Sequence, residues 1–137
     1  MRLSCLTISC LSICLALGAV PAAHAYDCAD QTQPGLDVCA DAAFKKADAG
    51  LNGAYKDILK RLKDDSAKTK LLVTAQKAWL SFRDAECAFS AAGVTGGSIY
   101  PMVVSLCLER VTKERTEDLS VYLKCEEGDT ECPVPAE

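Results

Sequence analysis

The chain has 137 residues and carries 19 Asp and Glu against 15 Lys and Arg, a formal net charge of −4. This length suits a single domain. The acidic balance argues against nucleic acid as a partner, because phosphate binding needs a basic face. It favours solubility and also permits attraction to a basic protein.

Residues 1–25 are typical of a secretory signal peptide. Arg2 gives a positive start, the segment from Leu3 to Val20 is mostly apolar, and Ala23-His24-Ala25 supplies a small-x-small cleavage pattern. The apolar run is short for a bilayer span and lacks a positive stop-transfer flank. We therefore expect cleavage after Ala25, a periplasmic or secreted chain of net charge −5 (14 − 19), and no stable membrane insertion after the signal is removed.

Lipid anchoring at Cys14 is the competing interpretation of this segment. Leu11-Ser12-Ile13-Cys14 partly matches a lipoprotein cleavage box, but bulky Ile13 stands where a small residue is normal. Lipidation is therefore the minor alternative.

Six cysteines follow the predicted cleavage site: Cys28, Cys39, Cys87, Cys107, Cys125 and Cys132. An even set in an oxidising compartment predicts three disulfides. A zinc site is not expected, because no CxxC pair exists and no histidine follows residue 25. No other metal site and no cofactor is predicted.

Three helices are predicted after an irregular arm at residues 26–36. Apolar residues recur at three- and four-residue steps over about 37–63, 68–91 and 98–122. Thr32 or Asp37 is suited to cap the first helix, and Ser98 the third, with Pro101 tolerated in its first turn. The Gly-rich stretch 93–97 is expected to turn the chain.

These elements predict an all-α fold, a small three-helix bundle made of an antiparallel hairpin plus a third helix and stapled by disulfides. The helical domain would cover residues 26–123, and residues 124–137 would form an acidic, Pro-containing tail closed locally by Cys125 and Cys132. Two pairings remain open for Cys87, which can reach Cys39 across the hairpin or Cys107 across the Gly-rich loop.

Polar residues share the apolar faces of all three helices. On the second helix Gln76, Trp79 and Arg83 form one stripe with Cys87. A buried arginine needs a partner, and Asp48 is the natural candidate, with Asp84 or Glu86 nearby. We expect an internal polar clasp that joins the helices, and we weigh against it a polar groove that receives a ligand. Its members would be Asp48, Asn52, Tyr55, Gln76, Trp79, Arg83 and Arg115.

The same residues carry a family resemblance. The matching segments are Ala47-Asp48-x-x-Leu51-Asn52-x-x-Tyr55, Gln76-x-x-Trp79-x-x-x-Arg83-Asp84-x-x-Cys87, Gly97-Ser98-Ile99, Cys107 and Thr112-x-x-Arg115-x-x-x-Leu119. Together they resemble the N-terminal domain of the LprI-type lysozyme-inhibitor family from Cys28 to about Tyr122. The resemblance implies an exported, mostly helical, disulfide-bonded bacterial domain, and it points to lysozyme as a partner. This chain departs from the namesake in lacking a good lipobox and in having an extra C-terminal cysteine pair.

The sequence does not favour an enzyme. The sole histidine, His24, leaves with the predicted signal, which removes the commonest general base and any Ser-His or Cys-His nucleophile system. The Gly93–Ser98 loop lacks the Gly-Lys-Ser/Thr ending of a phosphate loop. We therefore name no catalytic residue.

Two functions remain as hypotheses. The first is an exported binding protein that inhibits lysozyme or a related wall-degrading enzyme, with contacts among Gly96, Gly97, Glu126, Glu127 and Asp129. The alternative is a periplasmic structural or interaction protein that binds an envelope protein or a secreted toxin. In either case a protein partner is expected.

Overall fold

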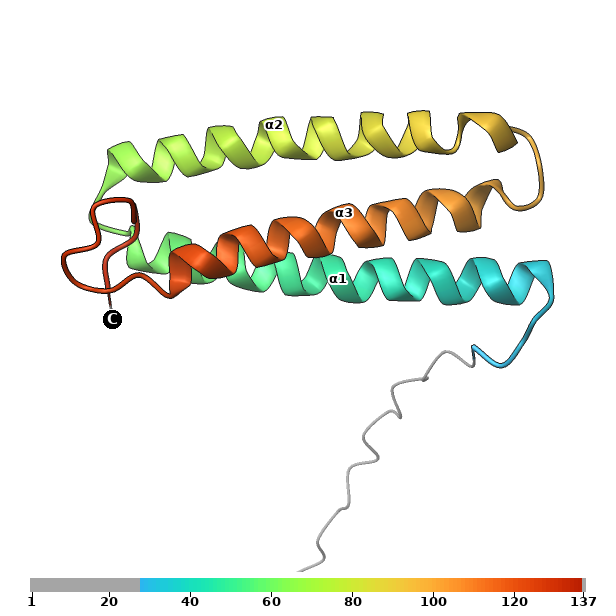
Figure 1. Cartoon of the computed structure of the whole chain (residues 1–137), viewed down its shortest axis with the longest axis horizontal. Helices are drawn as coiled ribbons and strands as arrows, with labels where there is room; N and C mark the ends of the chain where they lie inside the picture. Colours follow the sequence, from blue (N-terminus) through green and yellow to red (C-terminus); the bar gives the residue numbers. More distant parts are fainter. Residues whose placement is uncertain (1–27, 137) are drawn as a thin grey trace, which may run out of the picture.

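Three long helices form the molecule in the computed structural model, which describes residues 28–136 (Figure 1). They are α1 (Gln33–Arg61), α2 (Ser66–Ser90) and α3 (Tyr100–Leu123), with the short 3-10 turn η1 (Ala92–Val94) between the last two. The described range contains no strand. The all-α prediction is confirmed. The predicted signal peptide, residues 1–25, and Cys14 within it lie outside the described residues.

Local side-chain contacts set where two helices begin. Thr32 Oγ1 accepts a hydrogen bond from the Gly35 amide at 3.4 Å, and Pro34 occupies the first turn of α1. Asp65 accepts from the Lys68 amide at 2.9 Å at the start of α2, and this bond holds the pKa of Asp65 below its ordinary value. Of the two predicted caps for the first helix, Thr32 is the one used.

The prediction that Ser98 caps the third helix was wrong. The N-cap of α3 is Ile99, which makes no side-chain cap. Ser98 stands one residue too early, inside a turn in which the Tyr100 amide donates to the Gly97 carbonyl at 3.1 Å. Gly96, with φ +79°, supplies the left-handed backbone that this connection requires.

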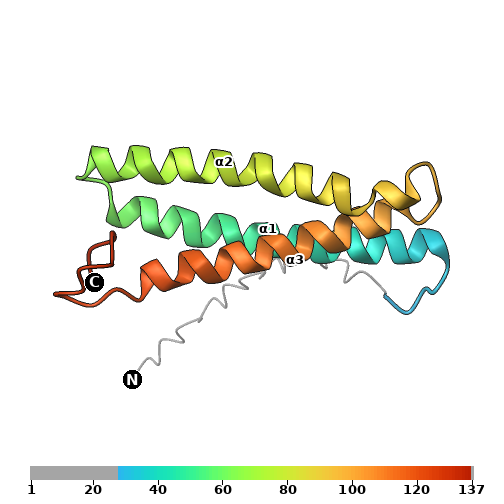
Figure 2. The same ribbon diagram turned by 45° about the horizontal axis from the view of Figure 1, so that its top comes forward.

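The helices run up, down and up, so that α1 and α3 point the same way (Figures 1 and 2). α1 and α3 pack closely, whereas α2 lies alongside and meets them mainly through α3. The main core lies between α1 and α3, and Leu51, Ile58 and Leu119 are its most deeply buried aliphatic residues.

The C-terminal segment is part of this core. Val134 is only 4% exposed and packs in the same cluster as Cys125 and Ile58. The segment expected to be an acidic tail therefore folds back over the end of α1 (Figure 1). No pattern in the sequence predicted this return, because one valine between two prolines has no helical or strand period.

Three disulfides close the described cysteines into pairs, Cys28–Cys39, Cys87–Cys107 and Cys125–Cys132. Cys87 therefore bonds across the Gly-rich loop, and the alternative pairing with Cys39 is not formed. Cys87 and Cys107 are both buried and form a second core cluster with Val111. This bridge ties the end of α2 to α3.

Removing the Cys87–Cys107 bridge should destabilise the protein more than removing Cys28–Cys39. The double variant C87A/C107A should lose about 3 kcal/mol of unfolding free energy, because it frees a loop of 20 residues and opens a buried cluster. C28A/C39A is the control, since Cys28 is exposed on the N-terminal arm. Denaturant unfolding measures both, and a larger loss for the control would contradict the assignment.

Thr112 provides a second stability test. It is fully buried on α3, and its hydroxyl has no hydrogen-bond partner among the described residues. Thr112→Val removes an unsatisfied polar group without changing the shape, so its unfolding free energy should stay equal or rise. Thr116→Val is the comparison, because the Thr116 hydroxyl donates to the Thr112 carbonyl at 2.8 Å. A larger loss of unfolding free energy for Thr112→Val than for Thr116→Val would show that the Thr112 hydroxyl has a hydrogen-bond partner and would contradict this assignment.

Candidate functional site

Arg83 lies between α2 and α1 with its side chain only 11% exposed. Its guanidinium carbon stands 5.2 Å from the centroid of the Trp79 ring and 5.5 Å from that of Phe44. Its Nη1 lies 3.4 Å from Asp48 Oδ1 on α1, and its Nε donates to Asp84 Oδ1 at 2.9 Å. The cation is thus stacked between two rings and compensated by two carboxylates.

A second polar contact joins α2 to α3. Arg115 Nε donates to Gln76 Oε1 at 3.3 Å, and Gln76 is buried. Arg115 is only 15% exposed, yet its nearest carboxylate among the described ion pairs is Asp118, 3.9 Å from Nη1 and 67% exposed. The charge of Arg115 is therefore weakly compensated.

The remaining predicted members lie at the edge of these contacts. Asn52 is exposed and donates to Asp48 Oδ2 at 2.8 Å, which orients the carboxylate that meets Arg83. Tyr55 is half-buried and packs against the main core. Six of the seven residues therefore fall into an Arg83 group with Asp48, Asn52 and Trp79 and an Arg115–Gln76 pair. Tyr55 belongs to neither. Phe44 was not among the residues predicted for this group. The available signal was its place four residues before Asp48, on the same face of α1.

The chemistry of these contacts is that of charge pairing and ring stacking. Within residues 28–136 no group of three His, Cys, Asp or Glu is placed to hold a metal ion.

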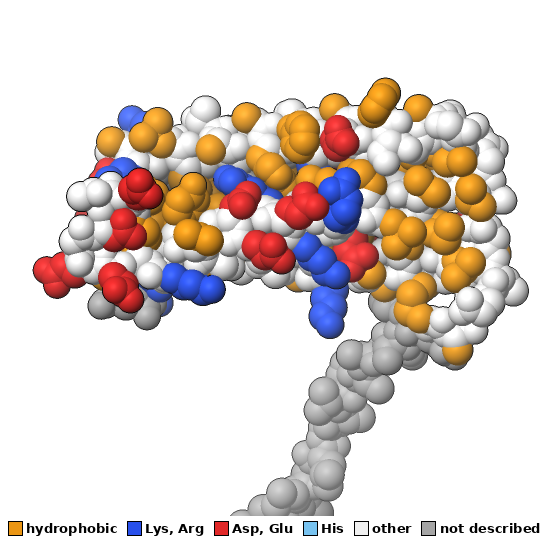
Figure 3. Space-filling model, in the orientation of Figure 1, with side chains coloured by type: hydrophobic (Ala, Val, Ile, Leu, Met, Phe, Trp, Pro, Cys, Tyr) orange, Lys and Arg blue, Asp and Glu red, His pale blue; other side chains and the backbone are white. Residues whose placement is uncertain are grey.

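The C-terminal loop presents four exposed carboxylates, those of Glu126, Glu127, Asp129 and Glu131. The Cys125–Cys132 bridge closes the loop, and the buried residues Cys125 and Val134 hold both of its ends in the core. Inside it, Gly128 has φ +90° and Asp129 Oδ1 accepts from the Glu131 amide at 3.0 Å. We call Glu126–Glu131 the acidic loop. It is visible in red at the end of the molecule in Figure 3.

A hollow of about 440 Å³ adjoins the acidic loop. Its lining includes Glu126, Glu127 and Asp129 of the loop and Lys68 of α2. A side chain that enters this hollow would meet carboxylates held by a closed loop.

The opposite end of the molecule, which we call the apolar end, carries exposed hydrophobic residues. Figure 3 shows hydrophobic side chains gathered where η1 joins α2 to α3. Phe89, Ile99 and Leu106, from this part of the chain, are large hydrophobic residues that remain exposed. Gly96 and Gly97 belong to this end, so the five contact residues suggested by the sequence fall at two distant places (Figure 1).

The partial exposure of Asp48, 38%, lowers the stability expected from its pair with Arg83. We expect Asp48→Ala to lower the unfolding free energy by about 1 kcal/mol. Arg83→Ala should lower it by about 2 kcal/mol or more, because it also removes the cation that stacks on two rings. Asp41→Ala, at an exposed pair with Lys45, should change stability by less than about 0.5 kcal/mol. Denaturant unfolding of the three variants is the measurement. Equal losses at positions 41, 48 and 83 would show that the buried stack contributes nothing.

Comparison with known proteins places this arrangement in a family. An uncharacterized protein of Rhizobium meliloti (strain 1021) is 34% identical over 108 residues, covering 71% of this chain and 78% of that protein. The crystal structure of a DUF1311 family protein from Pseudomonas putida KT2440 superposes with a TM-score of 0.61 at 24% identity, covering 66% of this chain and 92% of that one. The second likeness concerns the fold alone.

Two further findings bear on the whole chain. Within the part that the structure describes, none of the helices has the length and apolar character needed to cross a bilayer. The family model described as lysozyme inhibitor LprI matches residues 26–119, which include α1, α2 and nearly all of α3. The chain belongs to the LprI family.

Proposed function

We propose that this chain is an exported, non-enzymatic protein that binds lysozyme or a related wall-degrading enzyme and inhibits it. Membership of the LprI family supports the class of partner. The disulfides support an oxidising compartment, periplasmic or extracellular.

The acidic loop gives this proposal its strongest structural support. Four carboxylates stand on a short closed loop whose ends are buried, so little loop entropy is lost when a partner binds. A basic protein surface complements this loop, and a lysine or arginine of that surface fits the hollow beside it.

A triple variant that neutralises the loop tests the contact. E126Q/E127Q/E131Q removes three charges and leaves Asp129, whose carboxylate holds the Glu131 amide. The inhibition constant against a basic lysozyme should rise about tenfold, since exposed charge pairs contribute up to about 1 kcal/mol each. Inhibition by the unaltered protein should also weaken with added salt.

A matched control separates the loop from net charge. D57N/D64N/E117Q removes three exposed carboxylates elsewhere and should leave the inhibition constant nearly unchanged. Equal weakening by both triple variants would show only long-range attraction. Failure of the unaltered oxidised protein to inhibit any class of lysozyme would overturn the proposal.

The apolar end favours the second candidate, an interaction protein for an envelope component or a secreted toxin. Phe89 near the end of α2 and Leu106 near the start of α3 are exposed at the end of the bundle away from the acidic loop. They suit an apolar protein surface. The double variant F89S/L106S discriminates the two candidates, because it should leave lysozyme inhibition through the acidic loop unchanged.

A further inference from the structure

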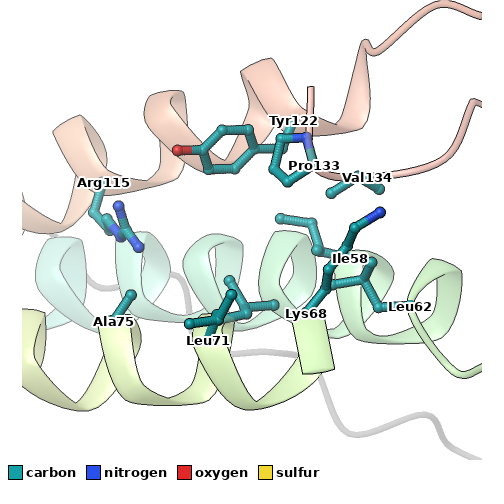
Figure 4. Close-up of a pocket in the computed structure, with 10 residues that line it drawn as sticks. Ile58, Leu62, Lys68, Leu71, Ala75, Arg115, Tyr122, Pro133 and Val134 are labelled. Atoms are coloured by element: carbon teal, nitrogen blue, oxygen red, sulfur yellow. The ribbon is translucent and has the colours of Figure 1, made fainter. Parts of the chain in front are cut away.

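A pocket of about 250 Å³ opens between the start of α2, the end of α3 and the C-terminal segment (Figure 4). Its walls are mostly aliphatic and include Ile58, Leu62, Leu72 and Val134. Leu71 also lines it and is 72% exposed. The pocket is separate from the acidic loop's hollow in its chemistry, although Lys68 and Val134 border both.

The charged residues that line this pocket, Arg115 and Lys68, are both cationic. This contrasts with the acidic balance of the whole chain. Lys68 has Asp65 as its partner at 3.4 Å, so Arg115 carries the less compensated charge. Its Nε is engaged by neutral Gln76, and the carboxylate of Asp118 lies at 3.9 Å and is mostly exposed.

The geometry puts this cation at one end of an apolar space. In Figure 4 the Arg115 side chain extends from α3 toward Ala75 of α2, and the phenol oxygen of Tyr122 points toward the same end of the pocket. A carboxylate placed there would meet a guanidinium and a hydroxyl, both hydrogen-bond donors. A partly buried guanidinium with weak compensation favours such an anion.

We propose that this pocket binds an amphipathic monoanion, a single acyl chain ending in a carboxylate. The carboxylate pairs with Arg115, and the chain lies among Leu72, Ile58 and Val134 and covers Leu71. The volume is slightly below the usual range for ligand sites, which favours one chain of medium length over a two-chain lipid. This binding is independent of lysozyme inhibition.

Calorimetric titration of the oxidised exported chain with sodium decanoate, below its micelle concentration, tests the proposal. Decanoate should bind, and decanol should bind about tenfold more weakly, because it lacks the charge that Arg115 complements. Arg115→Met should weaken decanoate about tenfold and leave decanol unchanged. Arg110→Met, on the same helix but outside this pocket, is the matched control and should bind decanoate as the unaltered protein does.

A second pair of variants tests the location without touching a charge. Ala75→Trp fills the pocket from its exposed wall and should abolish binding of both probes, whereas Ala78→Trp, exposed on the same helix outside the pocket, should not. Circular dichroism checks that both variants fold. Absence of decanoate binding, or undiminished binding in Arg115→Met and Ala75→Trp, would overturn the proposal. It would also be overturned if an apolar peptide with a free C-terminal carboxylate bound where decanoate did not.

Discussion

The stack of Phe44, Arg83 and Trp79 joins α2 to α1, whereas α2 meets the rest of the bundle mainly through α3. α1 and α3 pack against each other through aliphatic side chains, but the buried residues of α2 are Gln76, Arg83 and Cys87. A helix with such an inner face gains little from apolar burial alone. Its position instead depends on a cation held by two rings and two carboxylates, a glutamine bonded to Arg115, and a disulfide.

This way of holding α2 has consequences at both ends of the helix. At its C-terminal end the Cys87–Cys107 bridge fixes the turn into α3, and the nearby hydrophobic side chains are left exposed. At its N-terminal end no bridge joins α2 to α3, and the C-terminal segment fills part of the space through Val134. The pocket beside Arg115 occupies what remains of that space.

The two proposed binding functions therefore depend on different interactions at the same end of the molecule. The acidic loop offers exposed charge on a rigid support, which suits attraction to a basic protein. The pocket offers an apolar volume and a partly buried cation, which suits a small amphipathic anion. Lys68, in the first turn of α2, lines both.

The sequence by itself determined the helices, the placement of most polar residues on inner faces, and the resemblance to the LprI family, because three- and four-residue spacing is a local property. Arg83 and Asp48 could be paired in advance since each stood on an apolar stripe and a buried cation needs an anion. Only the tertiary structure decided between Cys39 and Cys107 as the partner of Cys87, because both choices satisfied the helical spacing. The tertiary structure alone showed that Val134 returns to the core and that Asp48 remains partly exposed to water. Burial depends on how far apart the helices lie, and residues remote in the chain set that distance.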